Sequence, residues 1–105
     1  MSTITSTFRG KALVESGVTP AIYNVSVPLA STEVSQALSA NVKRFTIRVR
    51  GNSKIQLSFI SGQSGTNYIT IPKGCTYTED QLNFTGTLYF QTSNGSQVVE
   101  ILEWV

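Results

Sequence analysis

The sequence predicts an all-β protein: a small antiparallel β-sandwich or barrel of six to seven short strands, with at most one short helix and an N-terminal arm. From residue 22 onward, apolar and polar residues alternate with the period of two that is typical of a half-buried strand. Clusters of Gly, Pro, Asn and Ser interrupt this alternation at short intervals, as turns do. The length of 105 residues suits one domain, so we expect an arm over residues 1–20 and a single domain over residues 21–105.

The first part of the chain holds the least regular elements. Residues 1–20 are rich in Ser and Thr and have no period, and we interpret them as an arm. A frayed terminus with one short strand is the alternative, which the sequence supports equally. Alternation from Ile22 to Leu29 predicts a strand, with Pro28 marking an edge or an end. The apolar residues of 31–41 are spaced for one helical face, so we expect a helix of two or three turns there. An extended loop that carries Leu38 inward is the alternative.

The clearest pattern lies in the middle of the chain. In residues 43–50 the apolar side chains fall on one face and the arginines on the other, which predicts a strand. Gly51-Asn52-Ser53 has turn composition, and the alternation then continues from Ile55 to Phe59. These features predict a β-hairpin.

Shorter strands follow to the end of the chain. A loop over 61–65 leads to a strand over 68–71, which Pro72-Lys73-Gly74 closes, and another short strand is expected at 75–77. Residues 87–91 form a strand with Leu88 and Phe90 inward, and Asn94-Gly95 turns the chain. The last strand, 98–105, ends on Trp104 and is expected to be central or clamped.

The composition argues against an enzyme. There is no histidine and a single cysteine, Cys75, which excludes a disulfide framework, a Cys/His zinc site and imidazole as a general base. The adjacent Glu79 and Asp80 fit a solvated loop better than a calcium site, because no further oxygen ligands follow at a suitable spacing. We therefore expect no catalytic residues, no cofactor and no metal.

The charge balance does not single out a partner. A net charge of +2, with 13% charged residues, is too small an imbalance to indicate nucleic acid or an anionic membrane. No apolar run is long enough to span a bilayer, and the first ten residues do not have the pattern of a secretory signal. We therefore expect no membrane partner.

Arginines make the strongest local charge pattern. Arg44, Arg48 and Arg50 share one face of a predicted strand and form a positive stripe. Phe45 and Phe59 are in phase with the core positions, so the stripe has no aromatic platform for stacking bases, and nucleic acid is disfavoured. Acidic residues gather in the C-terminal third, so the stripe could meet the acidic surface of another copy or another protein. A merely solvated face is the alternative.

Two aromatic residues are further candidates for contacts. Tyr89 is out of phase with its inward neighbours and should face outward or into an interface. Trp104 is in phase with Val98 and Leu102, so it either plugs the core or anchors a contact. A sugar-binding platform built from exposed tyrosines is also conceivable, and its members would be Tyr68, Tyr77 and Tyr89.

Three stretches carry a resemblance to a known group of proteins. Residues 37–47, 64–74 and 87–91, with their Ser/Thr/Asn-rich strands, Ile-Pro-Lys-Gly turn and Leu-Tyr-Phe-Gln strand, resemble small virion proteins encoded among the head genes of tailed bacteriophages. The resemblance covers about residues 22–105. It implies a decoration or cement protein, made in the host cytoplasm and located on the capsid surface, that binds the major capsid protein as a trimer or dimer.

In such a protein, an arm laces across neighbouring shell subunits. The candidate contacts are then those of the arm, the arginine stripe and the two aromatic residues, namely Thr3, Ile4, Thr5, Phe8, Arg44, Arg48, Arg50, Tyr89 and Trp104. Two other functions remain open: a glycan-binding or adaptor module of a head fibre or tail, and, more weakly, a small barrel that binds single-stranded nucleic acid.

Overall fold

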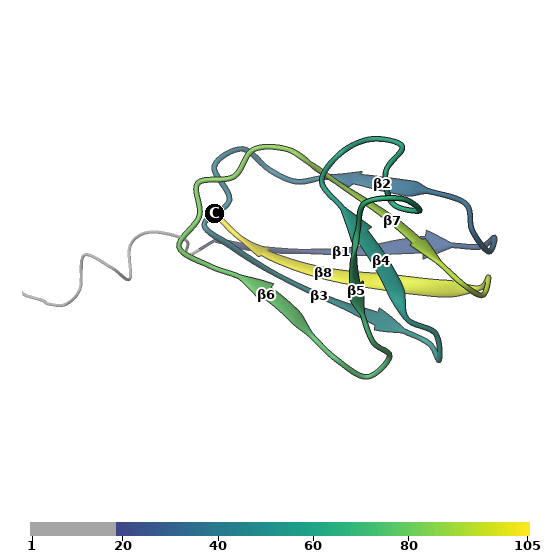
Figure 1. Ribbon diagram of the computed structural model, residues 1–105. Coiled ribbons are helices and arrows are strands. Elements are labelled where there is room, and N and C mark those ends of the chain that lie inside the picture. Colours follow the sequence, from purple (N-terminus) through teal and green to yellow (C-terminus); the bar gives the residue numbers. More distant parts are fainter. Residues whose placement is uncertain (1–18) are drawn as a thin grey trace, which may run out of the picture.

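The computed structural model describes residues 19–105 and contains two four-stranded sheets (Figure 1). Its eight strands are β1 (Pro20–Val27), β2 (Val34–Ala37), β3 (Arg44–Arg50), β4 (Ile55–Ser58), β5 (Ile69–Ile71), β6 (Tyr77–Glu79), β7 (Thr87–Thr92) and β8 (Gln97–Trp104). Sheet A has the order β1-β8-β3-β6 and sheet B the order β2-β7-β4-β5, with antiparallel neighbours throughout. The predicted all-β fold is confirmed.

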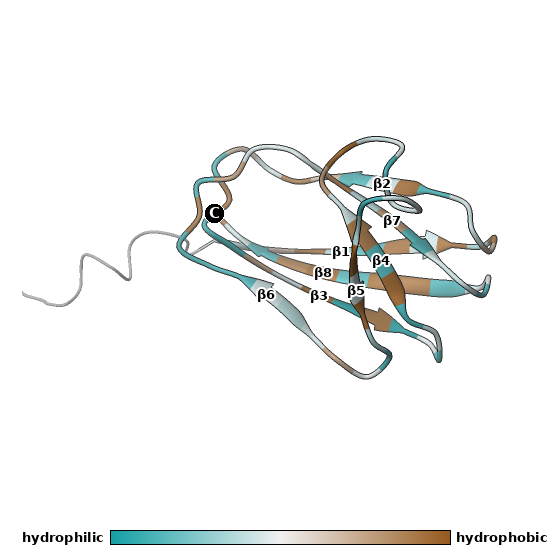
Figure 2. Cartoon of the chain, in the orientation of Figure 1, coloured by the Kyte–Doolittle hydropathy of each residue, from teal (hydrophilic) through white to brown (hydrophobic). Residues whose placement is uncertain are grey.

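One hydrophobic core lies between the sheets. Both sheets point their apolar side chains toward each other, and Figure 2 shows the corresponding hydrophobic segments along β3, β4 and β8. The fully buried members of the core include Ile47, Ile55, Leu88, Phe90, Val99 and Ile101. Leu88 and Phe90 therefore point inward as predicted, because β7 alternates strictly between buried and partly exposed residues.

The C-terminal strand is central, as expected. β8 pairs with β1 on one side and with β3 on the other along nearly its whole length. Because it is held by two neighbours, every second side chain points into the core, from Gln97 through Val99 and Ile101 to Glu103. The side chains between them form the centre of the outer face of sheet A.

The predicted hairpin of β3 and β4 is wrong. β3 pairs with β6 and β8 in sheet A, whereas β4 pairs with β5 and β7 in sheet B, so residues 51–54 carry the chain from one sheet to the other. Two strands that cover one core from opposite layers show the same alternation as two strands of one hairpin. Phe59 also departs from the pattern: β4 ends at Ser58, and the Phe59 side chain is 41% exposed.

The helix expected within residues 31–41 is also absent. Val34–Ala37 forms β2, which pairs with β7 and adds one strand beyond the expected range. Pairing with a strand far along the chain outweighed a helical spacing that spans only a few residues. The alternative of an extended segment that carries Leu38 inward is confirmed, since Leu38 is 9% exposed.

The start of the described chain belongs to sheet A. Thr19 and Val105 exchange two backbone hydrogen bonds of 3.1 and 2.9 Å, and β1 begins at Pro20. Thr19 and Pro20 were expected in the arm, but Thr19 bonds to the last residue of the chain and Pro20 is the first residue of β1. The predicted arm contacts Thr3, Ile4, Thr5 and Phe8 lie outside the described residues.

Hydrogen bonds from one carboxylate hold the long β4–β5 connection. The Glu33 carboxylate accepts the backbone N–H groups of Gly62 and Ser64, at 2.8 and 3.1 Å, and the hydroxyl of Ser64. The hydrogen bond from the Ser64 hydroxyl, with that from the Gly62 N–H, lowers the pKa of Glu33. The segment before β2 thereby anchors the loop on the other edge of sheet B.

Candidate functional site

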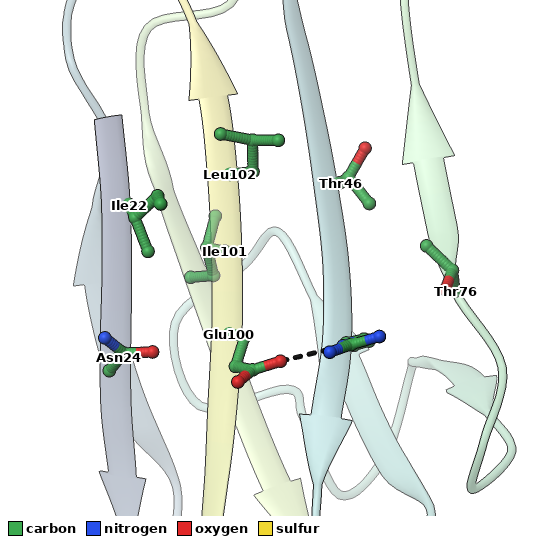
Figure 3. A pocket seen from close by; sticks show the side chains of 8 residues that line it. Ile22, Asn24, Thr46, Thr76, Glu100, Ile101 and Leu102 are labelled. Carbon is green, nitrogen blue, oxygen red and sulfur yellow. Dashed lines mark hydrogen bonds and ion pairs between the residues drawn. The ribbon is translucent and has the colours of Figure 1, made fainter. Parts of the chain in front are cut away.

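The outer face of sheet A gathers most of the predicted contact residues that fall within the described part of the chain. Because side chains alternate along a strand, one set of residues from β1, β8 and β3 points away from the core. We call this surface the sheet A face; its members are Ile22, Asn24, Arg44, Thr46, Arg48, Arg50, Val98, Glu100, Leu102 and Trp104. An open groove of about 380 Å³ runs over it, and Figure 3 shows residues that line the groove.

Glu100 joins two of the arginines. Its carboxylate oxygens lie 2.8 Å from Nε of Arg48 and 2.8 Å from Nε of Arg50; Figure 3 marks the first contact. Arg50 also donates to the side-chain oxygen of Asn24 at 3.1 Å. Glu100 of the same chain is therefore one acidic partner of Arg48 and Arg50, and a contact of the stripe with an acidic surface of another copy or another protein stays a prediction. Three arginines and one carboxylate leave this face positive.

This arrangement predicts a pH effect. Hydrogen bonds from Arg48 and then Arg50 lower the pKa of Glu100, so its contribution to stability is present above the unfolded pKa of about 4.3 and is lost as the pH falls through the folded pKa. We expect acidification from about pH 5 to pH 3 to destabilise the wild type more than Glu100→Gln. Thermal unfolding across this pH range measures the difference between the two losses of stability. Salt at about 1 M should reduce this difference, because the ion pairs are exposed. Equal losses in both proteins would contradict the assignment.

The other end of the sheet A face is apolar. Trp104 is partly exposed on the outer side, and the Arg44 guanidinium lies 5.1 Å from its ring centroid. Trp104 therefore does not plug the core, and its role as the anchor of a contact stays a prediction. Ile22, 69% exposed, lies opposite the partly exposed Leu102 in the pairing of β1 with β8. An apolar area and a charged area thus adjoin on one face, as they do in many protein interfaces.

Tyrosines are distributed over different surfaces. Tyr89 is on β7, with its partly exposed side chain on the outer side of sheet B, so it faces outward as predicted but away from the arginines. Tyr77 packs against the core beside Phe45, with ring centroids 6.4 Å apart. Burial and a hydrogen bond to Glu79 raise the pKa of Tyr77 to about 12. Tyr68, Tyr77 and Tyr89 therefore do not form one sugar platform.

Apart from Arg48, the residues that line the groove were not among the predicted contacts. Ile22, Asn24 and Leu102 meet the arginines only because β1, β8 and β3 are neighbours in the sheet, and these strands are far apart in the chain. One signal was present: Ile22 is a large apolar residue out of phase with the inward-facing residues that follow it.

Potential metal ligands are dispersed over the part of the chain that the structure describes. Residues 19–105 contain no group of three or more His, Cys, Asp or Glu residues that could hold a metal ion. Cys75 is an exposed thiol in the β5–β6 connection. Over the same residues there is no helix with the length and apolar character needed to cross a membrane.

Comparison with known proteins finds no family model, no curated protein and no solved structure that matches this chain. The function is therefore inferred from the geometry of the chain and from the resemblance of its sequence.

Proposed function

We propose that this chain is a non-enzymatic structural protein of a phage virion that decorates the capsid shell and self-associates there. The observation that carries this proposal is the sheet A face, where Arg44, Arg48, Arg50 and Trp104 lie together beside exposed apolar side chains. The major capsid protein is the proposed partner. Stabilisation then comes from many copies bound to a symmetric lattice, because multivalent contacts add up without any catalytic group.

The composition of the face supports a protein partner over the alternatives. Arginine and tryptophan are the residue types that most often dominate binding energy at protein interfaces. Two of the three arginines share a carboxylate and the third lies over the tryptophan ring, so the face does not offer free aromatic rings and unpaired cations for a nucleic-acid strand. Ser and Thr in the surrounding strands suit a polar rim.

Rebinding to capsid shells tests this proposal. Purified chain is added to phage heads stripped of it, and bound protein is measured against free concentration. We expect Arg44→Glu and Trp104→Ala each to weaken binding at least about tenfold, since each removes a central anchor of the face. Lys73→Glu is the matched control, because it changes the charge equally on the exposed β5–β6 connection and should bind as the wild type does.

Circular dichroism and thermal unfolding establish that each variant is folded before its binding is compared. If Arg44→Glu and Trp104→Ala bind shells with wild-type affinity, or if the wild type does not bind shells at all, the proposal is overturned.

A further inference from the structure

The four edge strands of the two sheets differ strongly in length. β2 has four residues, and β5 and β6 have three each, whereas β1 has eight. β1 also carries no charged residue, and its Ile22 is 69% exposed. Proteins normally protect a sheet edge by keeping the strand short or by placing charges on it. β1 therefore has the features of an edge that pairs with another strand.

The hydrogen-bond pattern shows which backbone groups this edge offers. Thr19 and Val105 exchange both of their backbone hydrogen bonds, so the odd-numbered residues of β1 point their N–H and C=O groups toward β8. The even-numbered residues Ile22, Asn24 and Ser26 consequently point theirs away from β8. Within residues 19–105, no backbone hydrogen bond is formed to these outward groups.

Two prolines bracket the open groups. Pro20 and Pro28 stand four residues before and four residues after Asn24, and neither has an N–H group to donate. Consider β1 paired antiparallel with β1 of a second copy, so that the two Asn24 residues lie opposite each other. Ile22 then lies opposite Ser26 of the other copy, and Pro20 lies opposite Pro28. The outward N–H and C=O groups of Ile22, Asn24 and Ser26 then all find partners, and the two prolines face each other beyond them. The Pro28 carbonyl needs no partner from the second copy, because it already accepts the Ser96 N–H at 3.2 Å. A centre at Ile22 or Ser26 would instead place Asn24 opposite a proline, which has no N–H group to donate to the Asn24 carbonyl.

We propose that β1 pairs with β1 of a second copy of this chain around a two-fold axis at Asn24, which joins two A sheets into one continuous eight-stranded sheet. This inference rests on the self-association included in the proposed function and names its surface. A pairing of identical strands is closed by the two-fold axis, so it yields a dimer and not a fibre.

Charge does not oppose this pairing. The nearest carboxylate on the sheet A face, Glu100, is already bound to Arg48 and Arg50, and β1 contributes no charge of its own. Ile22 and Leu102 of the two copies would lie on the same side of the joined sheet, so part of the exposed apolar surface stays close to the axis. A second copy therefore fits the edge better than a charged segment would.

Sedimentation equilibrium on the isolated full-length chain tests the dimer without any shell. We expect a concentration-dependent dimer in the wild type and in Asn24→Ala, which removes the side-chain contact to Arg50 but keeps the backbone donor. Asn24→Pro removes that donor as well and should weaken dimerisation at least about tenfold. The substitution leaves the pairing with β8 intact, because the Asn24 N–H points outward, and thermal unfolding checks this.

Cross-linking tests the register. In a Cys75→Ser background, Asn24→Cys places the two thiols on a directly opposed pair with Cα atoms about 5.5 Å apart, within disulfide range. Ile22→Cys places them about 13 Å apart and serves as the control. We expect mild oxidation to link Asn24→Cys much faster than Ile22→Cys.

Two results would overturn the inference: a monomer at the highest soluble concentration, or a dimer that Asn24→Pro does not weaken. Equal cross-linking of the two cysteine variants would overturn the register about Asn24. Because these measurements use no capsid, loss of the dimer would leave the shell-binding test of the sheet A face unaffected. Shell binding that fails while the dimer persists would refute the proposed function alone.

Discussion

Phe45→Ala is expected to lower the free energy of unfolding by about 3–5 kcal/mol, a large part of what a domain of this size has. Phe45 is 1% exposed and forms the centre of an aromatic cluster that links the two sheets. Its ring centroid lies 6.4 Å from those of Phe59 and Tyr77 and 5.9 Å from that of Phe84. Removing the ring leaves a cavity. Its neighbours belong to different strands and loops, so they cannot all move inward to fill it.

Phe59→Ala is the matched comparison. Phe59 belongs to the same cluster, 5.9 Å from Phe84, but its side chain is 41% exposed. We expect a loss of about 1–2 kcal/mol, because only part of the side chain leaves an apolar environment. Urea unfolding of both variants at one pH measures the difference. Similar losses for the two substitutions would contradict the position of Phe45 between the sheets.

Glu103→Ala should also destabilise the fold strongly, by about 2–4 kcal/mol. Although Glu103 is an acidic residue, its side chain is fully buried and faces the core from the central strand β8. Its carboxyl group accepts hydrogen bonds from the backbone N–H of Ser39, at 3.0 Å, and from the Ser39 hydroxyl. The hydroxyl group of Tyr23 lies 3.4 Å from the same Ser39 oxygen. Truncation leaves these groups without an acceptor and opens a cavity.

Glu103→Gln is the matched comparison, because it opens no cavity and still offers Ser39 a hydrogen-bond acceptor. The amide keeps the volume of the side chain, its oxygen can still accept from the Ser39 N–H, and the Ser39 hydroxyl can turn to accept from the amide nitrogen. We expect a change of no more than about 1 kcal/mol in the free energy of unfolding. If Gln destabilises as much as Ala, the hydrogen bonds to Ser39 do not have the role assigned to them.

The individual strands could be predicted because their signal is local. Alternation of apolar and polar residues identified the region of β3, the strand β7 with Leu88 and Phe90 inward, and the long final strand β8. The same alternation does not identify partners. It could not show that β3 and β4 lie in different sheets, because both cover the same core from opposite sides.

Charged residues illustrate the same limit at the candidate site. Glu100 and Glu103 both belong to the acidic residues of the C-terminal third, but only Glu100 is at the surface, where it binds Arg48 and Arg50. Glu103 is buried, because a segment 64 residues earlier in the chain supplies Ser39 as its hydrogen-bond partner. Contacts between such distant segments follow from the sheet order, which a single sequence does not encode in any local pattern.

The number of copies of this chain in purified phage particles tests the proposed function most directly. Quantitative protein staining gives the ratio of this chain to the major shell protein. The account predicts about one copy per shell subunit, or about one third or two thirds of that number, as expected for a protein bound across a symmetric lattice. A handful of copies per particle, or none, would contradict a decoration protein and direct attention to a tail, a fibre or a free binding module.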